Sequence, residues 1–340
     1  MNYNGFEIDM LSVGDADCTL ITEWTNGVST RVLIDGGNAE SAKTLKGFLE
    51  AQGIYYIEHV VCTHPHDDHA AGLVEFVKDA EFHIGTVWVH RPERHVNLLG
   101  VELALNRAHG LKRVKVIREA LETVSSLILA CEARGITIAE PFAGGQIGCL
   151  TVMGPSERYY AELLAQFADS SEIQASDSVL NKCDLEEFAD ALLASKGAGN
   201  SDTLMDSPPT SPENNSSVIL ATRQQSETFL FTADAGAQAL ALAAREYRLG
   251  NCDWMQIPHH GSRRNITVSL IQHFSPKWAF VSAAGNTKHP RRAVVNAFKK
   301  QGAAVYSTHY PRPGNIWHHR GNVPARSGYA AATALWDATT

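Results

Sequence analysis

The sequence predicts an α/β fold in which two β-sheets pack face to face and a layer of helices covers each outer face. Three observations predict this four-layer αββα sandwich. With 340 residues, 44% of them hydrophobic, the chain can bury a large core. Strand-like and helix-like segments alternate, and the second half repeats the order of the first. No short repeat of the solenoid type is present. We expect a single domain over residues 1–340, with helical insertions at about residues 91–140 and 156–212.

The first half begins with strands that are joined by a hairpin turn at Asn26-Gly27. Apolar, β-branched runs predict strands at residues 3–13, 17–24, 28–34, 57–62, 86–90 and 149–154. Helical spacing of apolar residues predicts helices at residues 40–52, 70–79 and 114–134. The second insertion leads into residues 197–217, whose glycine, serine, aspartate and proline content predicts an exposed loop.

The second half has the same alternating pattern. Strands are predicted at residues 217–224, 228–233, 253–257, 278–283 and 303–308, and near residues 315–318 and 328–336. Helices are predicted at residues 236–248, 265–274 and 290–301.

Composition and charge exclude several classes of protein. The net charge of −8 argues against a broad electrostatic grip on nucleic acid. Residues 91–118 are nevertheless basic and residues 157–213 acidic, so the first is either a clamp for an anionic substrate or an ordinary solvated surface. No window of about 18 apolar residues and no signal peptide occur, so we expect a cytoplasmic protein without a membrane partner. The six scattered cysteines include no Cys-x-x-Cys pair, which predicts reduced thiols.

The most informative stretch is Thr63-His64-Pro65-His66-Asp67-Asp68-His69, which directly follows a predicted strand. Imidazole nitrogen and carboxylate oxygen are the ligands that divalent metals such as zinc prefer. In an extended segment His64 and His66 point to the same side and can bind one ion together. Asp68 and His69 fall where the chain turns into a helix, and we expect them to face a second ion. The alternative is a polar loop that is merely rich in histidine, but the close spacing favours a metal site.

Later strands end in further candidate ligands. Asp234 follows an apolar strand and is expected to bridge both ions, although it could instead cap the next helix. One imidazole of the pair His259-His260 should complete the second ion, and we favour His259, with the other facing substrate or a metal ligand. His289 precedes a helix that begins with proline. It lies either at the surface or where it can donate a proton or a hydrogen bond to a phosphate.

Cationic residues flank these loops in an otherwise acidic protein, which fits a phosphate-bearing substrate, although they could be ordinary surface residues. They are Arg263, Arg264, Lys288, Arg291 and Arg292.

These motifs resemble the metallo-β-lactamase fold superfamily, and within it the branch that contains the hydrolase domain of ComEC-type DNA-uptake proteins and their free-standing relatives. The segments that carry the resemblance are Val13-Gly14-Asp15-Ala16-Asp17, Leu33-Ile34-Asp35-Gly36-Gly37, residues 63–69 with Gly72-Leu73, Asn214-Asn215-Ser216-Ser217-Val218, Leu230-Phe231-Thr232-Ala233-Asp234-Ala235, Pro258-His259-His260-Gly261-Ser262 and Asn286-Thr287-Lys288-His289-Pro290. The two insertions fall outside the resemblance.

The resemblance implies two divalent metal ions, with Zn²⁺ favoured and Mn²⁺ the alternative. His64, His66 and Asp234 would hold the first ion. The second would take Asp68, His69, Asp234 and one histidine of the pair at 259–260. Many superfamily members supply a third histidine to the first ion, but the matching position here falls in Asn214-Asn215. The first ion would then be held by fewer protein ligands or completed by water.

The resulting functional hypothesis is a dinuclear phosphodiesterase or nuclease in which a hydroxide held between the ions attacks phosphorus. Its substrate would be DNA, RNA, a nucleotide or another phosphodiester. The expected catalytic residues are Asp68, His260 and His289, with either histidine protonating the leaving oxygen. The residues expected to contact substrate are Asn215, Ser262, Arg263 and Lys288. Two rival hypotheses are a hydrolase of carbonyl substrates (lactones, thioesters or β-lactams) and a non-catalytic interaction module on the same fold.

Overall fold

The computed structural model describes residues 2–95, 121–176, 203–204, 209–286, 288–326 and 333–335, with the backbone alone for residues 168–176. The first sheet contains β1 (Asn4–Met10), β2 (Thr19–Thr25), β3 (Val28–Ile34), β4 (Tyr56–Val61), β5 (His83–Trp88), β6 (Thr137–Ala139) and β14 (Ile316–Asn322). The second contains β7 (Gln146–Ile147), β8 (Leu150–Gly154), β9 (Ile219–Gln224), β10 (Glu227–Phe231), β11 (Trp254–Gln256), β12 (Trp278–Val281) and β13 (Ala304–Ser307). The helices are α1 (Ser41–Ala51), α2 (Asp67–Val77), α5 (Glu122–Ala133), α6 (Glu157–Ser176), α8 (Pro212–Asn215), α9 (Ala237–Tyr247), α10 (Val268–Phe274), α11 (Arg292–Lys300) and the 3₁₀-helix η2 (His259–Gly261).

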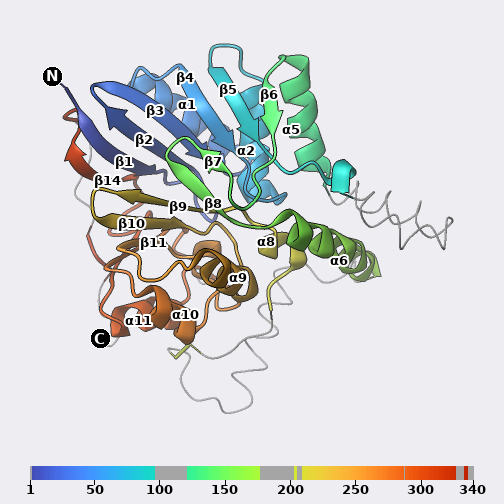
Figure 1. The fold of residues 1–340 in the computed structure, drawn as a ribbon, viewed down its shortest axis with the longest axis vertical. Coiled ribbons are helices and arrows are strands. Elements are labelled where there is room, and N and C mark those ends of the chain that lie inside the picture. The colour runs from blue at the N-terminus through green and yellow to red at the C-terminus, as the bar shows by residue number, and fades with distance from the viewer. Residues whose placement is uncertain are drawn as a thin grey trace.

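The two mixed sheets form the central layers of the fold (Figure 1). Their strand orders are β14-β1-β2-β3-β4-β5-β6 and β13-β12-β11-β10-β9-β8-β7. A core that includes Phe6 and Ile8 of β1 with Phe229 and Trp254 fills the space between them. Separate cores lie under α1, α2 and α5 on the first sheet and under α9, α10 and α11 on the second. The predicted αββα sandwich is therefore confirmed.

Several element boundaries differ from the prediction. Helix α2 begins at Asp67 rather than Ala70, which puts Asp68 and His69 in its first turn. The short strands β6 and β7 were not predicted, because two or three residues carry no periodic signal. Within the described residues no helix is long and apolar enough to cross a bilayer.

The predicted insertions are described only in part. Helix α5 packs against α2, and β6 pairs with β5, so residues 122–139 belong to the layers of the fold. The second insertion contributes α6. Residues 96–120, 177–202, 205–208, 287, 327–332 and 336–340 lie outside the described residues, and of the last strand, predicted near residues 328–336, only 333–335 are described. Most of the basic segment at 91–118 therefore lies outside the described residues.

The topology gathers five loops at one edge of the sandwich. Strands β3 and β4 run parallel in the first sheet, and β10, β11 and β12 run parallel in the second. Their carboxyl ends, from which loops lead to the site, therefore meet at common edges. Helix α2 approaches the loop after β3 so closely that a Cβ on Gly72 would lie 1.9 Å from the carbonyl oxygen of Gly36. Glycine at position 72 is what permits this contact.

Candidate metal centre

The histidine-rich stretch leaves β4 and enters α2. His66 stands at the N-cap in an extended conformation, and the helix begins with Asp67 and Asp68, where acidic side chains interact favourably with the helix dipole. His64 and His69 are buried, with 2% and 0% of their surfaces exposed. The local sequence thus folds into a strand end and a first helical turn that present several metal-ligating groups on one side.

A first group of potential ligands consists of His64, His66 and Asp234, with one ligand atom of each within 4.8 Å of the others. His64 Nε2 lies 3.1 Å from His66 Nδ1 and 3.7 Å from Asp234 Oδ2. These are the residues that the sequence analysis assigned to the first ion.

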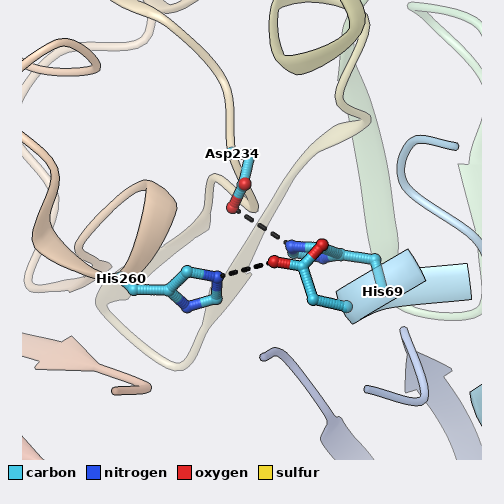
Figure 2. A group of neighbouring side chains, drawn as sticks. His69, Asp234 and His260 are labelled. Carbon is cyan, nitrogen blue, oxygen red and sulfur yellow. Dashed lines mark ion pairs between the residues drawn. The ribbon is translucent and has the colours of Figure 1, made fainter. Parts of the chain in front are cut away.

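A second group consists of Asp68, His69, Asp234 and His260, again with ligand atoms within 4.8 Å of one another. Asp234 Oδ1 lies 3.3 Å from His69 Nε2, and His260 Nε2 lies 3.4 Å from Asp68 Oδ2. Figure 2 shows His69, Asp234 and His260 pointing toward one another. Because Asp234 belongs to both groups, its carboxylate stands between two potential ion sites. Gly236, and not Asp234, is the N-cap of α9.

The buried polar atoms of these groups fit a metal. His69 Nε2, His260 Nε2 and both carboxylate oxygens of Asp234 are buried and make no hydrogen bond. Such atoms are costly unless an ion or water satisfies them. The opposite ring nitrogens are held: His69 Nδ1 is 2.7 Å from Asp35 Oδ2, and His260 Nδ1 is 2.9 Å from the carbonyl oxygen of Ser282. This arrangement is typical of metal-binding histidines, whose second nitrogen donates to a fixed acceptor.

Asp35 was part of a recognised motif but was not assigned to the site. Its carboxylate also accepts hydrogen bonds from the backbone N–H and the hydroxyl of Thr63, at 2.8 and 2.7 Å. The Asp35-Gly36-Gly37 sequence after an apolar strand was the available signal. Its partner His69 is 34 positions away, so the contact could not be derived locally.

The pKa values of the site reflect an excess of buried carboxylates. Burial lowers the pKa of His260, but Asp68, Asp17 and Asp234 outweigh it and raise that pKa to about 9. Asp234 and Asp35 similarly overcome burial and raise the pKa of His69 well above its usual value. Burial is the main cause that raises the pKa of Asp17 to about 6. The negative charge of the carboxylates thus favours protonated imidazoles, and bound divalent cations would neutralise the same charge.

Metal binding is therefore expected to release protons and to strengthen as pH rises toward 9. The imidazole of His260, whose pKa is raised to about 9, must lose its proton to become a ligand. Each displaced proton makes the apparent affinity rise about 10-fold per pH unit below that pKa. Calorimetric titration of Zn²⁺ at pH 7 in two buffers of different ionisation enthalpy measures the number of protons released. His260→Asn should release at least one proton fewer, and equal proton counts would contradict the expectation.

The pair His259-His260 is arranged differently from the sequence expectation. His260, rather than the favoured His259, belongs to the group with Asp68 and His69. The geometry therefore places His260, which was expected to donate a proton, among the potential metal ligands. His259 Nε2 instead lies 3.6 Å from Asp234 Oδ2. The reason is backbone conformation, because both histidines adopt left-handed φ angles of 49° and 53° that no local pattern predicts.

His289 lies beside this pair and is buried rather than at the surface. Its ring centroid is 5.6 Å from that of His259 and 5.7 Å from that of His260. Burial and the nearby His260 and His259 lower the pKa of His289 to about 2, so it is neutral and can donate only an N–H. Helix α11 begins at Arg292, beyond His289.

The expected substrate contacts lie around the same loops. Asn215 is buried in α8 and its amide donates to the carbonyl oxygen of Ser211. Ser262 is buried at the end of η2, and its hydroxyl accepts a hydrogen bond from the backbone N–H of Arg264. Arg263 and Lys288 are half-buried.

Comparison with known proteins finds one family model and several solved structures that are similar to this chain. Residues 11–129 match the family model of the metallo-beta-lactamase superfamily, and no curated protein matches the chain. A metal-dependent hydrolase of the beta-lactamase superfamily is similar with a TM-score of 0.48 and 12% identity, covering 93% of this chain and 100% of its own. A diphosphatase from the PhnP family has a TM-score of 0.42 and 10% identity, with 93% and 98% covered. The metallo-beta-lactamase SMB-1 has a TM-score of 0.33 and 11% identity, with 86% and 93% covered. The family match covers residues 11–129, and the two sheets with their outer helices form an αββα sandwich that is consistent with the metallo-β-lactamase fold.

Proposed function

We propose that the protein is a metal-dependent hydrolase that holds two divalent ions and cleaves phosphodiesters. The observation that carries the proposal is the sharing of one buried carboxylate, Asp234, by two groups of ligands whose remaining members differ. Zn²⁺ is the favoured ion, because the two groups contain four imidazoles besides the carboxylates, and Mn²⁺ is the alternative.

Two bound cations would lower the pKa of a water molecule to about 7 and neutralise charge on the reacting group. The chain's own residues hold that arrangement in place. Asp35 orients His69, and the carbonyl oxygen of Ser282 orients His260. His289, neutral and buried next to the histidine pair, is positioned to donate a hydrogen bond to a leaving oxygen.

Positive charge near His289 supports phosphodiesters over carbonyl substrates. Lys288 and Arg291 both lie close enough to contribute to the lowered pKa of His289. An anionic substrate is stabilised by such cations, whereas a neutral lactone or thioester gains little from them. The ComEC-type motifs described above support the same substrate class, with DNA, RNA or a nucleotide as the specific candidates.

Asp68→Asn tests the proposal, and the same substitution at the preceding residue, Asp67, is the matched control. Asp67 also lies in the first turn of α2 but is exposed and outside both ligand groups, so Asp67→Asn keeps the same chemistry of substitution. Bis-(p-nitrophenyl) phosphate, single-stranded DNA and RNA are assayed with Zn²⁺ or Mn²⁺. We expect Asp68→Asn to lower turnover at least about 100-fold, as loss of a charge-stabilising group typically does, and Asp67→Asn to leave it unchanged.

The same experiment separates the rival functions. A parallel panel of lactones, thioesters and β-lactams detects a carbonyl hydrolase, and metal-dependent activity only on that panel would reject the phosphodiesterase assignment. Fewer than one ion per chain after purification without chelator, with no activity on either panel, would favour the non-catalytic module.

A further inference from the structure

The two histidines that follow β11 occupy an unusual turn. His259 and His260 are consecutive, and both have left-handed backbone conformations with φ of 49° and 53°. Residues other than glycine rarely adopt this strained region, so two in succession indicate that the turn serves a site. Successive residues in this conformation direct both imidazoles to the metal centre, with ring centroids 5.7 Å apart.

The two oxygens of the Asp234 carboxylate face different ligand groups, and they show on which side each histidine of the pair lies. Its Oδ1 faces the second group, at 3.3 Å from His69 Nε2. Its Oδ2 faces the first group, at 3.7 Å from His64 Nε2, and it is this same oxygen that lies 3.6 Å from His259 Nε2. His260 Nε2 is instead 3.4 Å from Asp68 Oδ2. His259 is thus on the side of the first ion and His260 on the side of the second.

Hydrogen bonds fix which nitrogen of His259 is available. Asn265 is fully buried, and its Nδ2 donates to the carbonyl oxygen of Asp234 at 2.7 Å, so its Oδ1 is the acceptor 2.9 Å from His259 Nδ1. The amide nitrogen of Asn214 also approaches His259 Nδ1, but at the longer distance of 3.3 Å. We therefore assign the proton to Nδ1, which leaves the lone pair on Nε2, the atom that faces Asp234 Oδ2. A ring held through Nδ1–H with Nε2 turned to the site is the arrangement of a metal ligand.

We propose that His259 is the third imidazole ligand of the first ion, so that the adjacent histidines are divided between the two ions. This inference rests on the proposed dinuclear function. The first group contains two imidazoles and one shared carboxylate. Where many superfamily members supply a third histidine, this sequence has Asn214-Asn215, and His259 would take the place of that histidine. His259 Nε2 lies 3.6 Å from Asp234 Oδ2, the carboxylate oxygen of that group that also faces His64.

Counting bound ions tests the assignment independently of activity. The wild type, His259→Asn and His260→Asn are stripped of metal and titrated with Co²⁺, whose visible absorption reports each site. Asparagine is chosen because it tolerates left-handed φ angles. We expect two tight ions in the wild type and one in each variant, with different spectra because different ions are lost. His289→Asn removes a neighbouring imidazole outside both ligand groups and should keep two ions.

A second variant guards against a folding defect. Asn265→Ala leaves the imidazole in place but removes the acceptor that orients it, and we expect about 10–100-fold weaker binding of the first ion alone. If His259→Asn and Asn265→Ala both kept wild-type affinity for two ions, the assignment of His259 would be overturned. The proposed function would still stand in that case, provided that the wild type hydrolyses phosphodiesters. A wild type that binds fewer than two ions would overturn both.

Discussion

Replacing Asp234 by asparagine is expected to weaken both ion sites together and to lower hydrolysis roughly 1,000-fold. The carboxylate is completely buried and is the one residue shared by the two ligand groups among the described residues. An amide has the same shape, so the substitution opens no cavity, but it removes the negative charge that faces both ions. Loss of several kcal/mol of charge stabilisation corresponds to such a factor, at about 1.4 kcal/mol for each tenfold.

Comparison with single-site variants makes this prediction specific. His64→Asn should weaken the first ion only, and His69→Asn the second only, because each belongs to one group. Metal content after exhaustive dialysis and Co²⁺ titration measure the three proteins side by side. If Asp234→Asn kept one ion at wild-type affinity, the carboxylate would serve a single site, and the bridging role would be contradicted.

The sequence predicted the close approach of those candidate ligands whose positions depend on nearby residues. The spacing from His64 to His69 after an apolar strand indicated both the strand end and the helical turn that present them. Asp234 was predicted because the apolar strand before it leaves a carboxylate without a local partner. In both cases the signal lies within about ten residues, which is the range over which strand and helix periodicity operates.

The features of the site and of the fold that were not predicted depend on contacts between distant segments. The choice between His259 and His260 follows from two left-handed residues and from the positions of Asn265 and the Ser282 carbonyl, which come from different loops. No periodic pattern encodes them. A strand was predicted near residues 315–318, but its antiparallel pairing as β14 with β1 joins segments about 300 residues apart, which no local pattern indicates.

Asp35→Ala is expected to reduce both stability and second-ion affinity, because one buried carboxylate serves the fold and the site. It accepts hydrogen bonds from the backbone N–H and hydroxyl of Thr63 and lies 2.7 Å from His69 Nδ1. Removing one member of a buried, hydrogen-bonded charge cluster costs about 3–5 kcal/mol. Losing the acceptor that orients a ligating histidine costs about 10–100-fold in metal affinity. Urea unfolding with chelator present measures the first effect, and Co²⁺ titration the second.

Two controls separate these contributions. Asp35→Asn keeps an oxygen acceptor in the same place and should recover part of the stability. Asp253→Ala removes a carboxylate that accepts from the backbone N–H of Thr228 and pairs with Lys277, away from the ligand groups. It should lower stability without weakening either ion. Because Asp35 also lies in a left-handed conformation, with φ of 57°, alanine there adds backbone strain that asparagine avoids. Second-ion affinity that stayed at the wild-type level in Asp35→Ala would show that His69 is oriented by packing rather than by this carboxylate.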